Sequence, residues 1–319
     1  MNSNLFVVIL ASAIFYGTPI YFAALGELLT ERSGVLNLGV EGMMLVGAVL
    51  GSWGSQHVGG PAWFVVLAAV FLAMIGAAAM GAIHAFLAIT MRVNQTVAGL
   101  ALTIFAGAVG LSSYLASTWK VAAHPATRPI RKLNVFGLAD KPVIGPLLFN
   151  HTILTYLSWV LAIVATWYLF GTRQGLNLRS VGESPQTADA MGISVVRYRY
   201  VHTILGGALA GIGGACYSLA IVPTWVDGMT KGAGWIAIAL VIFGFWRPDL
   251  TLAGAYLFGG LSSLGLTLKA RNVHINGSIL DALPFAMTIV VLVLVSSGWA
   301  RRRLGAPASL GVPYEREER

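Results

Sequence analysis

Charged residues are scarce in this chain of 319 residues. Aspartate, glutamate, lysine and arginine together make up 10% of it, whereas 57% of the residues are hydrophobic. An ordinary soluble domain is about 25% charged, so the composition excludes a water-soluble fold. The only cysteine, Cys216, lies in an apolar, glycine-rich run. A disulfide framework and a zinc site built from cysteines are therefore excluded as well.

Catalytic motifs are also missing. The sequence has no Gly-x-x-x-x-Gly-Lys-Ser/Thr phosphate loop, no His-Glu-x-x-His metal motif and no Gly-x-Ser-x-Gly nucleophile motif. We therefore expect no enzyme, no catalytic residue and no cofactor or metal site in this chain, so that any chemistry of ATP and magnesium belongs to a partner. The net charge of +8 is spread over short loops and a tail, and we expect no nucleic-acid partner.

Long apolar runs, such as residues 5–24 and 62–89, are abundant instead. They are longer than the alternating segments of about ten residues that build a membrane β-barrel. Only a helix satisfies its backbone hydrogen bonds within one apolar segment, and about 20 residues cross the bilayer. We predict an all-α, polytopic transmembrane bundle with about nine spans (eight to ten). The predicted spans are residues 5–25, 36–56, 62–90, 95–118, 151–170, 201–222, 232–245, 250–268 and 279–299.

Two hydrophilic segments, residues 119–150 and 171–200, are too long for simple helix hairpins. If the arginines at 301–303 are cytoplasmic, counting backwards puts the N-terminus outside, the first segment in an extracytoplasmic loop and the second in a cytoplasmic loop. Twelve of the 20 lysines and arginines then lie inside. Five of the outer eight fall in 119–150, which is the chief objection to this orientation. We expect a transmembrane domain over 1–300 and a charged cytoplasmic tail over 301–319.

Thirty-eight glycines are present, several of them at small-xxx-small spacing, as in Gly207 with Gly211 and Gly206 with Ala210. Small residues let helix backbones approach closely in lipid, where the hydrophobic effect does not drive helices together. A tight bundle is expected.

The first polar motif spans residues 31–48 and places Asn37 and Glu41 four residues apart at the start of an apolar run. In a helix both would share one face, and a carboxylate near hydrocarbon costs a few kcal/mol unless it meets a partner or water. Glu41 is expected to point inward, where it either lines the solute pathway or a gate, or locks two helices together. Glycines at 34, 39 and 42 indicate a broken or re-entrant segment.

Other polar candidates are isolated. Asn94 and Gln95 open the fourth predicted span, either as an inner gate or as caps of a helix end. Trp235 lies near a span end, where it is an interfacial anchor or stacks on a planar ligand. His84 and Asp281 are single polar groups in apolar spans, and we interpret each as a hydrogen bond between helices rather than a proton relay.

The second motif lies in the inner loop. Ser184 followed by Pro185 predicts a helix start, and a short helix over 187–191 is stopped by Gly192 and anchored by Ile193. Such an amphipathic helix, lying parallel to the membrane, is a rigid lever that a cytoplasmic motor domain can move. The alternative is a solvated connection, since such loops carry caps too.

These two motifs carry a resemblance that runs along essentially the whole chain. GVLNLGVEGMM at 34–44 and VGESPQTADAMGI at 181–193 resemble the N-terminal signature and the coupling helix of bacterial ATP-binding-cassette importer permeases, in the branch for ribose-type sugars and nucleosides. Ser184 stands where asparagine is common, so contacts with the motor can differ. The resemblance implies ATPase contacts for Gly182, Glu183, Ser184, Pro185, Ala188, Ala190, Gly192 and Ile193.

The resemblance also implies an assembly. Length, together with PVIGPLLF at 142–149, is most similar to the shorter of two paired nucleoside permeases with the type II importer fold. The expected partners are a second, larger permease, a cytoplasmic ABC ATPase, an extracytoplasmic solute-binding lipoprotein and the lipid of the bacterial cytoplasmic membrane. Simple sugars are an alternative to nucleosides. An ion-coupled secondary transporter would need paired intramembrane carboxylates, and only Glu41 and Asp281 are available. A non-transporting scaffold is the remaining alternative.

Overall fold

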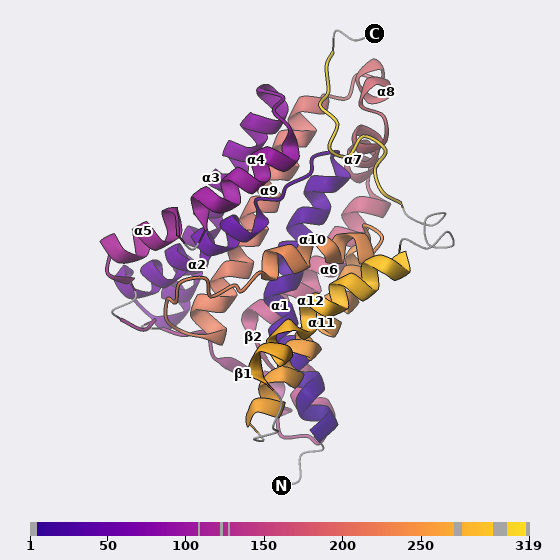
Figure 1. Cartoon of the computed structure of the whole chain (residues 1–319). Helices are drawn as coiled ribbons and strands as arrows, with labels where there is room; N and C mark the ends of the chain where they lie inside the picture. The colour runs from indigo at the N-terminus through magenta and orange to yellow at the C-terminus, as the bar shows by residue number, and fades with distance from the viewer. Residues whose placement is uncertain are drawn as a thin grey trace.

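The computed structural model describes residues 5–107, 109–121, 124–126, 128–270, 276–295 and 305–316, and it is a bundle of helices with one small hairpin (Figure 1). The first half contains α1 (Leu5–Arg32), α2 (Val40–His57), α3 (Ala62–Ala85), α4 (Gln95–Ala106), α5 (Leu111–Thr118), β1 (Lys132–Asn134) and β2 (Asn150–Thr152). The second half contains α6 (Ile153–Gly171), α7 (Arg173–Glu183), α8 (Pro185–Ala190), α9 (Val195–Cys216), α10 (Ala233–Phe243), α11 (Pro248–Ala270) and α12 (Gly277–Val295).

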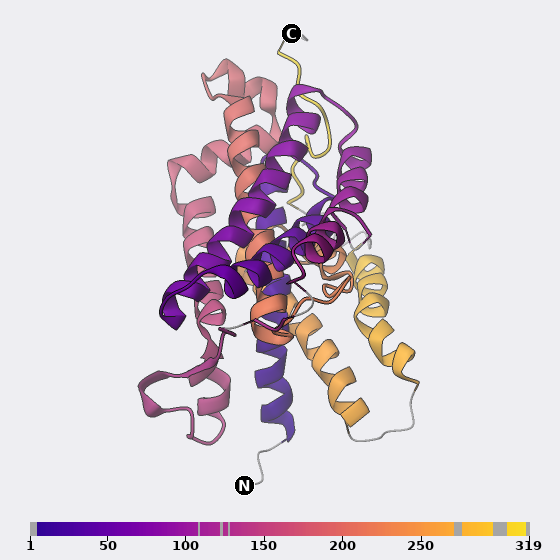
Figure 2. The ribbon, with the colours of Figure 1, turned by 90° about the vertical axis from the view of Figure 1, so that its left-hand side faces the viewer.

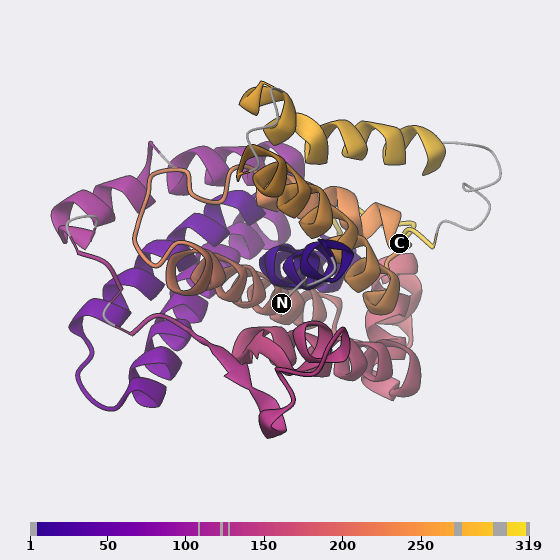
Figure 3. The same cartoon turned by 90° about the horizontal axis from the view of Figure 1, so that it is seen from below.

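Helix α1 is the centre of the bundle. Seen along its axis, it is surrounded by the other helices (Figure 3), and it packs against α6, α9, α10 and α11. Tyr21, Phe22, Leu25 and Leu28 are fully buried. The central position explains why this helix is apolar all round instead of carrying one apolar stripe.

Helix α9 packs against α1, α2 and α3 through glycines. A Cβ atom on Gly206 would lie 2.7 Å from the carbonyl oxygen of Gly26 in α1, and one on Gly211 would lie 2.4 Å from the carbonyl oxygen of Ala73 in α3. Only glycine permits this approach of two backbones. The predicted tight packing through small-xxx-small spacing is confirmed.

Apolar side chains cover the outer face of several helices. Trp63 and Phe71 on α3, Ile104 on α4, and Ile163 and Trp167 on α6 are all more than half exposed. Six helical segments are long and apolar enough to cross a membrane. They are Phe6–Arg32, Ala62–Thr90, Gln95–Thr118, Ile153–Gly171, Val195–Ile221 and Pro248–Leu268, with shorter apolar helices at Ala233–Phe243 and Ser278–Val291. A multi-pass helical membrane protein is therefore shown, with six such segments among the described residues instead of the nine predicted.

Several predicted boundaries were wrong. Helix α1 continues seven residues beyond the predicted end at 25, α2 begins at Val40 instead of 36, and α9 begins at Val195 instead of 201. The predicted bounds of span 95–118 are confirmed, but the span is divided inside, because α4 ends before Gly107, whose backbone is extended, and α5 begins after Gly110. These bounds were predicted from the length of apolar runs alone, whereas buried polar partners and glycines determine where the helices begin and end.

The two hydrophilic segments lie at opposite ends of the bundle (Figures 1 and 2). Residues 119–150 include β1, which pairs antiparallel with β2 in the register Leu133 opposite His151. Apart from this hairpin, helices form nearly everything that is described, so the predicted helical fold class is confirmed. Helices α7 and α8 lie at the other end, together with residues 305–316. The arginines at 301–303 fall outside the described residues.

Candidate functional site: a capped terminal helix and a buried glutamate

Helix α8 is short but capped at both ends. The Ser184 hydroxyl accepts a hydrogen bond from the Thr187 amide at 3.4 Å, and Pro185 occupies the first helical position. At the other end Gly192 has φ of +80°, and the amides of Gly192 and Ile193 donate to the carbonyls of Asp189 and Ala188 at 2.9 and 3.0 Å. This pair of bonds is a Schellman motif. The predicted short helix with its serine start and glycine stop is confirmed.

One side of α8 is buried and the other is free. Pro185 and Ala188 are buried, and Ala188 packs in a small apolar cluster with Val181 and Val195. Glu183, Ala190 and Met191 are exposed, and Met191 keeps 77% of its surface. The helix is therefore a rigid surface feature with an accessible face, which is the geometry that a docking partner requires.

Residues 305–316 hold α7 and α8 against the bundle. The Ser309 amide and hydroxyl both donate to the carbonyl of Gly182, at 3.0 and 2.6 Å. The guanidinium of Arg199, which is 1% exposed, donates to the carbonyls of Ser33 and Val312 at 3.2 Å each. Residues 305–316 thus join α7 to α9 and to the end of α1.

Residues 33–39 form an irregular, mostly buried connection between α1 and α2. Side chains of other elements satisfy its backbone: Gln95 Oε1 accepts from the Leu36 amide at 2.7 Å, and His84 Nε2 lies 3.0 Å from the Leu36 carbonyl oxygen. The Asn37 amide donates to Glu27 Oε1 at 3.0 Å. The predicted break is confirmed. His84 was predicted to bond helix to helix, but its partner lies in this irregular connection and not in a helix. Irregular backbone is tolerated at such depth only where protein satisfies it.

Asn37 and Glu41 do not share a helix face. Because α2 begins at Val40, the prediction from helical spacing was wrong. The Asn37 side chain instead accepts from the Gly39 amide at 2.9 Å and turns the chain into α2. Asn37 therefore shapes the connection, while Glu41 faces a different element.

Glu41 lies where the N-terminal ends of α2 and α10 meet. Its Oε1 accepts from the Thr230 hydroxyl at 2.6 Å and from the Gly232 amide at 2.9 Å, and its Oε2 accepts from the Gly234 amide at 2.6 Å. Gly232 caps α10 with φ of +79°. A carboxylate at this position is stabilised by two otherwise unpaired helix amides and by the helix dipole. The contacts are those of an interhelical lock, one of the two predicted alternatives.

The remaining candidates lie apart. Asn94 caps α4 by accepting from the Val97 amide at 3.1 Å, which matches the cap alternative. Gln95 is buried and bound to Leu36, whereas Trp235 keeps 37% of its surface. The side chain of Asp281 lies outside the described residues.

Sequence inspection missed two acids, Glu27 and Glu31, which are both 1% exposed. Glu31 Oε2 accepts from the Trp246 indole at 2.5 Å. Their spacing of four residues at the end of an apolar run could have indicated two acids on one buried helix face. Within the described parts of the chain, no group of three histidine, cysteine, aspartate or glutamate side chains could hold a metal ion.

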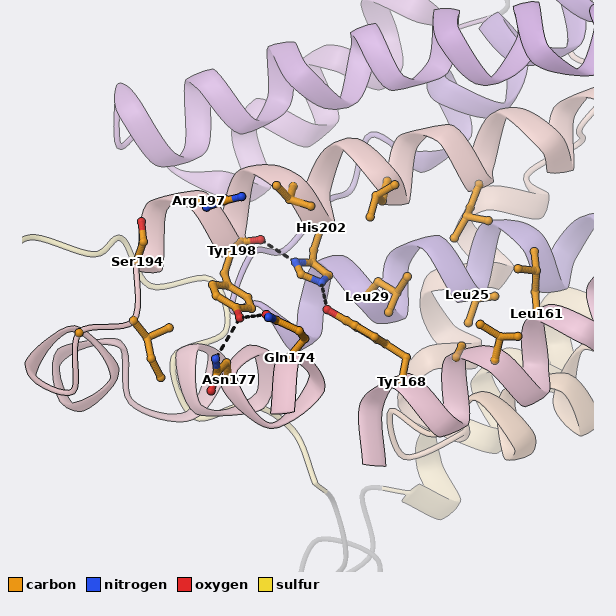
Figure 4. A pocket seen from close by; sticks show the side chains of 17 residues that line it. Leu25, Leu29, Leu161, Tyr168, Gln174, Asn177, Ser194, Arg197, Tyr198 and His202 are labelled. Atoms are coloured by element: carbon orange, nitrogen blue, oxygen red, sulfur yellow. Dashed lines mark hydrogen bonds between the residues drawn. The ribbon is translucent and has the colours of Figure 1, made fainter. Parts of the chain in front are cut away.

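A groove of about 720 Å³ opens between α1, α6, α7 and α9 (Figure 4). At one end the Tyr198 hydroxyl donates to Gln174 Oε1 and accepts from Asn177 Nδ2 at 3.0 Å. His202 Nδ1 lies 2.7 Å from the Tyr198 carbonyl oxygen, and Nε2 lies 2.8 Å from the Tyr168 hydroxyl. In the neutral ring Nδ1 therefore carries the proton. This network fixes the polar wall of the groove.

The chain is similar to known transport proteins along its length. A family model described as branched-chain amino acid transport system / permease component matches residues 9–292. A putative glucose ABC transporter permease of Haloferax volcanii is 37% identical, covering 97% of this chain and 98% of that protein. The guanosine permease NupQ of Bacillus subtilis and the nucleoside permease NupC of Lactococcus lactis are 35% and 36% identical, each covering 98% of both chains. The chain belongs to this family of permease components.

Proposed function

We propose that this chain is a permease subunit of an ATP-driven importer for nucleosides. The observation that carries the proposal is full-length identity of 35% and 36% to permeases named for guanosine and nucleosides, joined to a capped helix at one end of the bundle. A sugar is the second candidate, because the relative from Haloferax volcanii is named for glucose.

In this proposal a separate cytoplasmic ATPase docks on α8 and supplies the ATP and magnesium chemistry. The free face of α8 near Ala190 and Met191 contacts the ATPase. Gly182 and Glu183 lie at the end of α7, directly before α8. The motion passes through residues 305–316 and Arg199 to the ends of α1 and α9. The capped ends make α8 a lever, since a floppy loop would absorb the displacement.

The proposed membrane topology has nine spans. It adds α2, α10 and α12 to the six long segments, with α8 in the cytoplasm and the β1–β2 hairpin outside. The membrane is the bacterial cytoplasmic membrane. An extracytoplasmic solute-binding lipoprotein would deliver solute at the hairpin end. A second, larger permease completes the pathway, and the match to a second guanosine permease of Bacillus subtilis, NupP, supports such a pair.

The pathway wall is proposed to include the junction of α2 and α10. Glu41 accepts from three donors of the protein, so we assign it to shaping this wall. Trp235 follows Gly234 in the same turn and is accessible, which suits stacking on a planar base.

Uptake by the assembled complex in proteoliposomes tests the proposal. With the binding protein and ATP present, labelled guanosine and adenosine should accumulate, and glucose and ribose should not. Met191→Glu places a charge on the free face of α8 and should weaken ATPase association at least about tenfold, or about 1.4 kcal/mol. Met191→Leu is the matched control and should behave as wild type. ATP-independent uptake, or normal ATPase binding by Met191→Glu, would refute it.

A further inference from the structure

The groove between α1, α6, α7 and α9 is polar at one end and apolar along the rest (Figure 4). Arg197, Ser194, Gln174 and Asn177 line the end next to α8. Leucines line the remainder, among them Leu29, Leu161, Leu205 and Leu209. Figure 4 shows this gradient directly, with the labelled polar side chains together and the labelled leucines beyond them.

We propose that this groove binds one anionic phospholipid, with its phosphate at Arg197 and an acyl chain along the leucines. The proposal goes beyond solute transport. It rests on the proposed function only for placing α8 on the cytoplasmic side, and therefore for assigning the lipid to the inner leaflet.

The length of the groove matches one leaflet. Arg197 and Leu209 are twelve residues apart on α9, or about 18 Å along a helix. The hydrocarbon core of a bilayer is about 30 Å thick, so half of it is about 15 Å. A lipid whose headgroup lies at Arg197 therefore has its acyl chain beside Leu205 and Leu209. A volume of about 720 Å³ also falls within the range of specific small-molecule sites.

The charge at the polar end is complementary to a phosphate. Arg197 is exposed, and within the described ranges its guanidinium makes no hydrogen bond or ion pair. Ser194 and Asn177 add uncharged donors beside it. Basic pockets between transmembrane helices on the cytoplasmic side bind anionic headgroups, because the inner leaflet is negatively charged.

The wall behind the headgroup is rigid. The His202 ring bonds to the Tyr198 carbonyl oxygen and to the Tyr168 hydroxyl. The Tyr198 hydroxyl bonds to Gln174 and Asn177. The polar end therefore keeps its shape without a ligand. Preformed sites lose less conformational entropy when they bind. Since the groove joins α7 to α9, a bound lipid would also contact the helices that flank α8 in the chain.

Lipid retention by the purified complex tests this proposal without any uptake measurement. The complex is placed in nanodiscs of equal phosphatidylglycerol and phosphatidylcholine and re-extracted in mild detergent, and the retained lipid is counted by native mass spectrometry. Wild type should favour phosphatidylglycerol roughly fivefold, which corresponds to about 1 kcal/mol for one basic residue. Arg197→Gln should bring the ratio near one. Arg173→Gln, a matched exposed arginine at the start of α7 that does not line the groove, should keep it.

Leu205→Trp fills the groove and should lower retention of both lipids, whereas Leu205→Ile should not. A ratio near one in wild type would overturn the proposal, as would a ratio that Arg197→Gln leaves unchanged. Cross-linking from position 205 to another protein subunit would show that a protein covers the groove. Each of these results leaves the proposed nucleoside uptake standing.

Discussion

Removal of the Glu41 carboxylate is expected to destabilise the junction between α2 and α10. Three donors, from Thr230, Gly232 and Gly234, converge on it at 2.6 to 2.9 Å. Leaving a buried donor without an acceptor costs about 1–3 kcal/mol. Thr230 and Gly234 are buried and Gly232 is partly accessible, so Glu41→Ala should cost about 3–6 kcal/mol.

Glu41→Gln keeps the volume but turns an amide NH₂ toward one or more of these donors, and should cost about 2–4 kcal/mol. For a chain of this size that lowers the unfolding temperature by about 3–6 °C. Differential scanning fluorimetry of the purified protein measures the shift. Thr230→Val is the matched control, because it removes one donor and leaves the carboxylate paired, at about 1 kcal/mol.

Two results would refute this argument. An unchanged unfolding temperature in Glu41→Gln would show that the three contacts contribute no net stability. An unchanged unfolding temperature combined with lost uptake would assign Glu41 to the solute pathway instead of the helix junction. The solute pathway is the other of the two predicted alternatives.

Three further predictions concern other parts of the molecule. Gly206→Val places a Cβ 2.2 Å from a neighbouring hydroxyl oxygen and should abolish monodisperse protein on fluorescence-detected size exclusion, whereas Gly59→Ala, with no atom within 4 Å, should have no effect. Arg199→Met removes the donors that hold residues 305–316 and should make this segment several-fold more sensitive to limited proteolysis at unchanged expression. Burial holds the pKa of His151 below its ordinary value of 6.5, so protonation favours the unfolded hairpin. The protection factors of the β2 amides, which correct for the slower intrinsic exchange at lower pH, should fall as the pH drops below 6.5, and His151→Gln should remove that dependence.

Apolar length and backbone hydrogen bonding predict the helical membrane fold. They place α6 within two residues of its observed bounds and the start of α3 at its observed residue, and capping residues predict α8. The same approach ends α1 too early, because Glu27 and Glu31 look like the edge of the membrane. Their partners, the Asn37 amide and the Trp246 indole, are distant in sequence, and no local pattern shows that these carboxylates are satisfied.

The candidate site was also predictable only where the interacting residues are close in sequence. Ser184 and Gly192 act through neighbours within a few residues, so their roles are visible in the sequence. Glu41 acts through residues 189 to 193 positions away, and its interhelical role could be stated only as one of two alternatives. The division of 95–118 at glycines could have been foreseen from Gly107 and Gly110, but glycine occurs in many unbroken helices of this chain as well.

The binding of residues 305–316 to Gly182, Arg199 and the carbonyl of Gly34 has a consequence for biosynthesis. These residues leave the ribosome after every helix that they contact. Until then the Gly182 carbonyl and the Arg199 guanidinium lack the partners supplied by this segment. The surface around α8 therefore reaches its final form only after residues 305–316 have been synthesised, so an ATPase that recognises this surface would discriminate against chains that lack this segment.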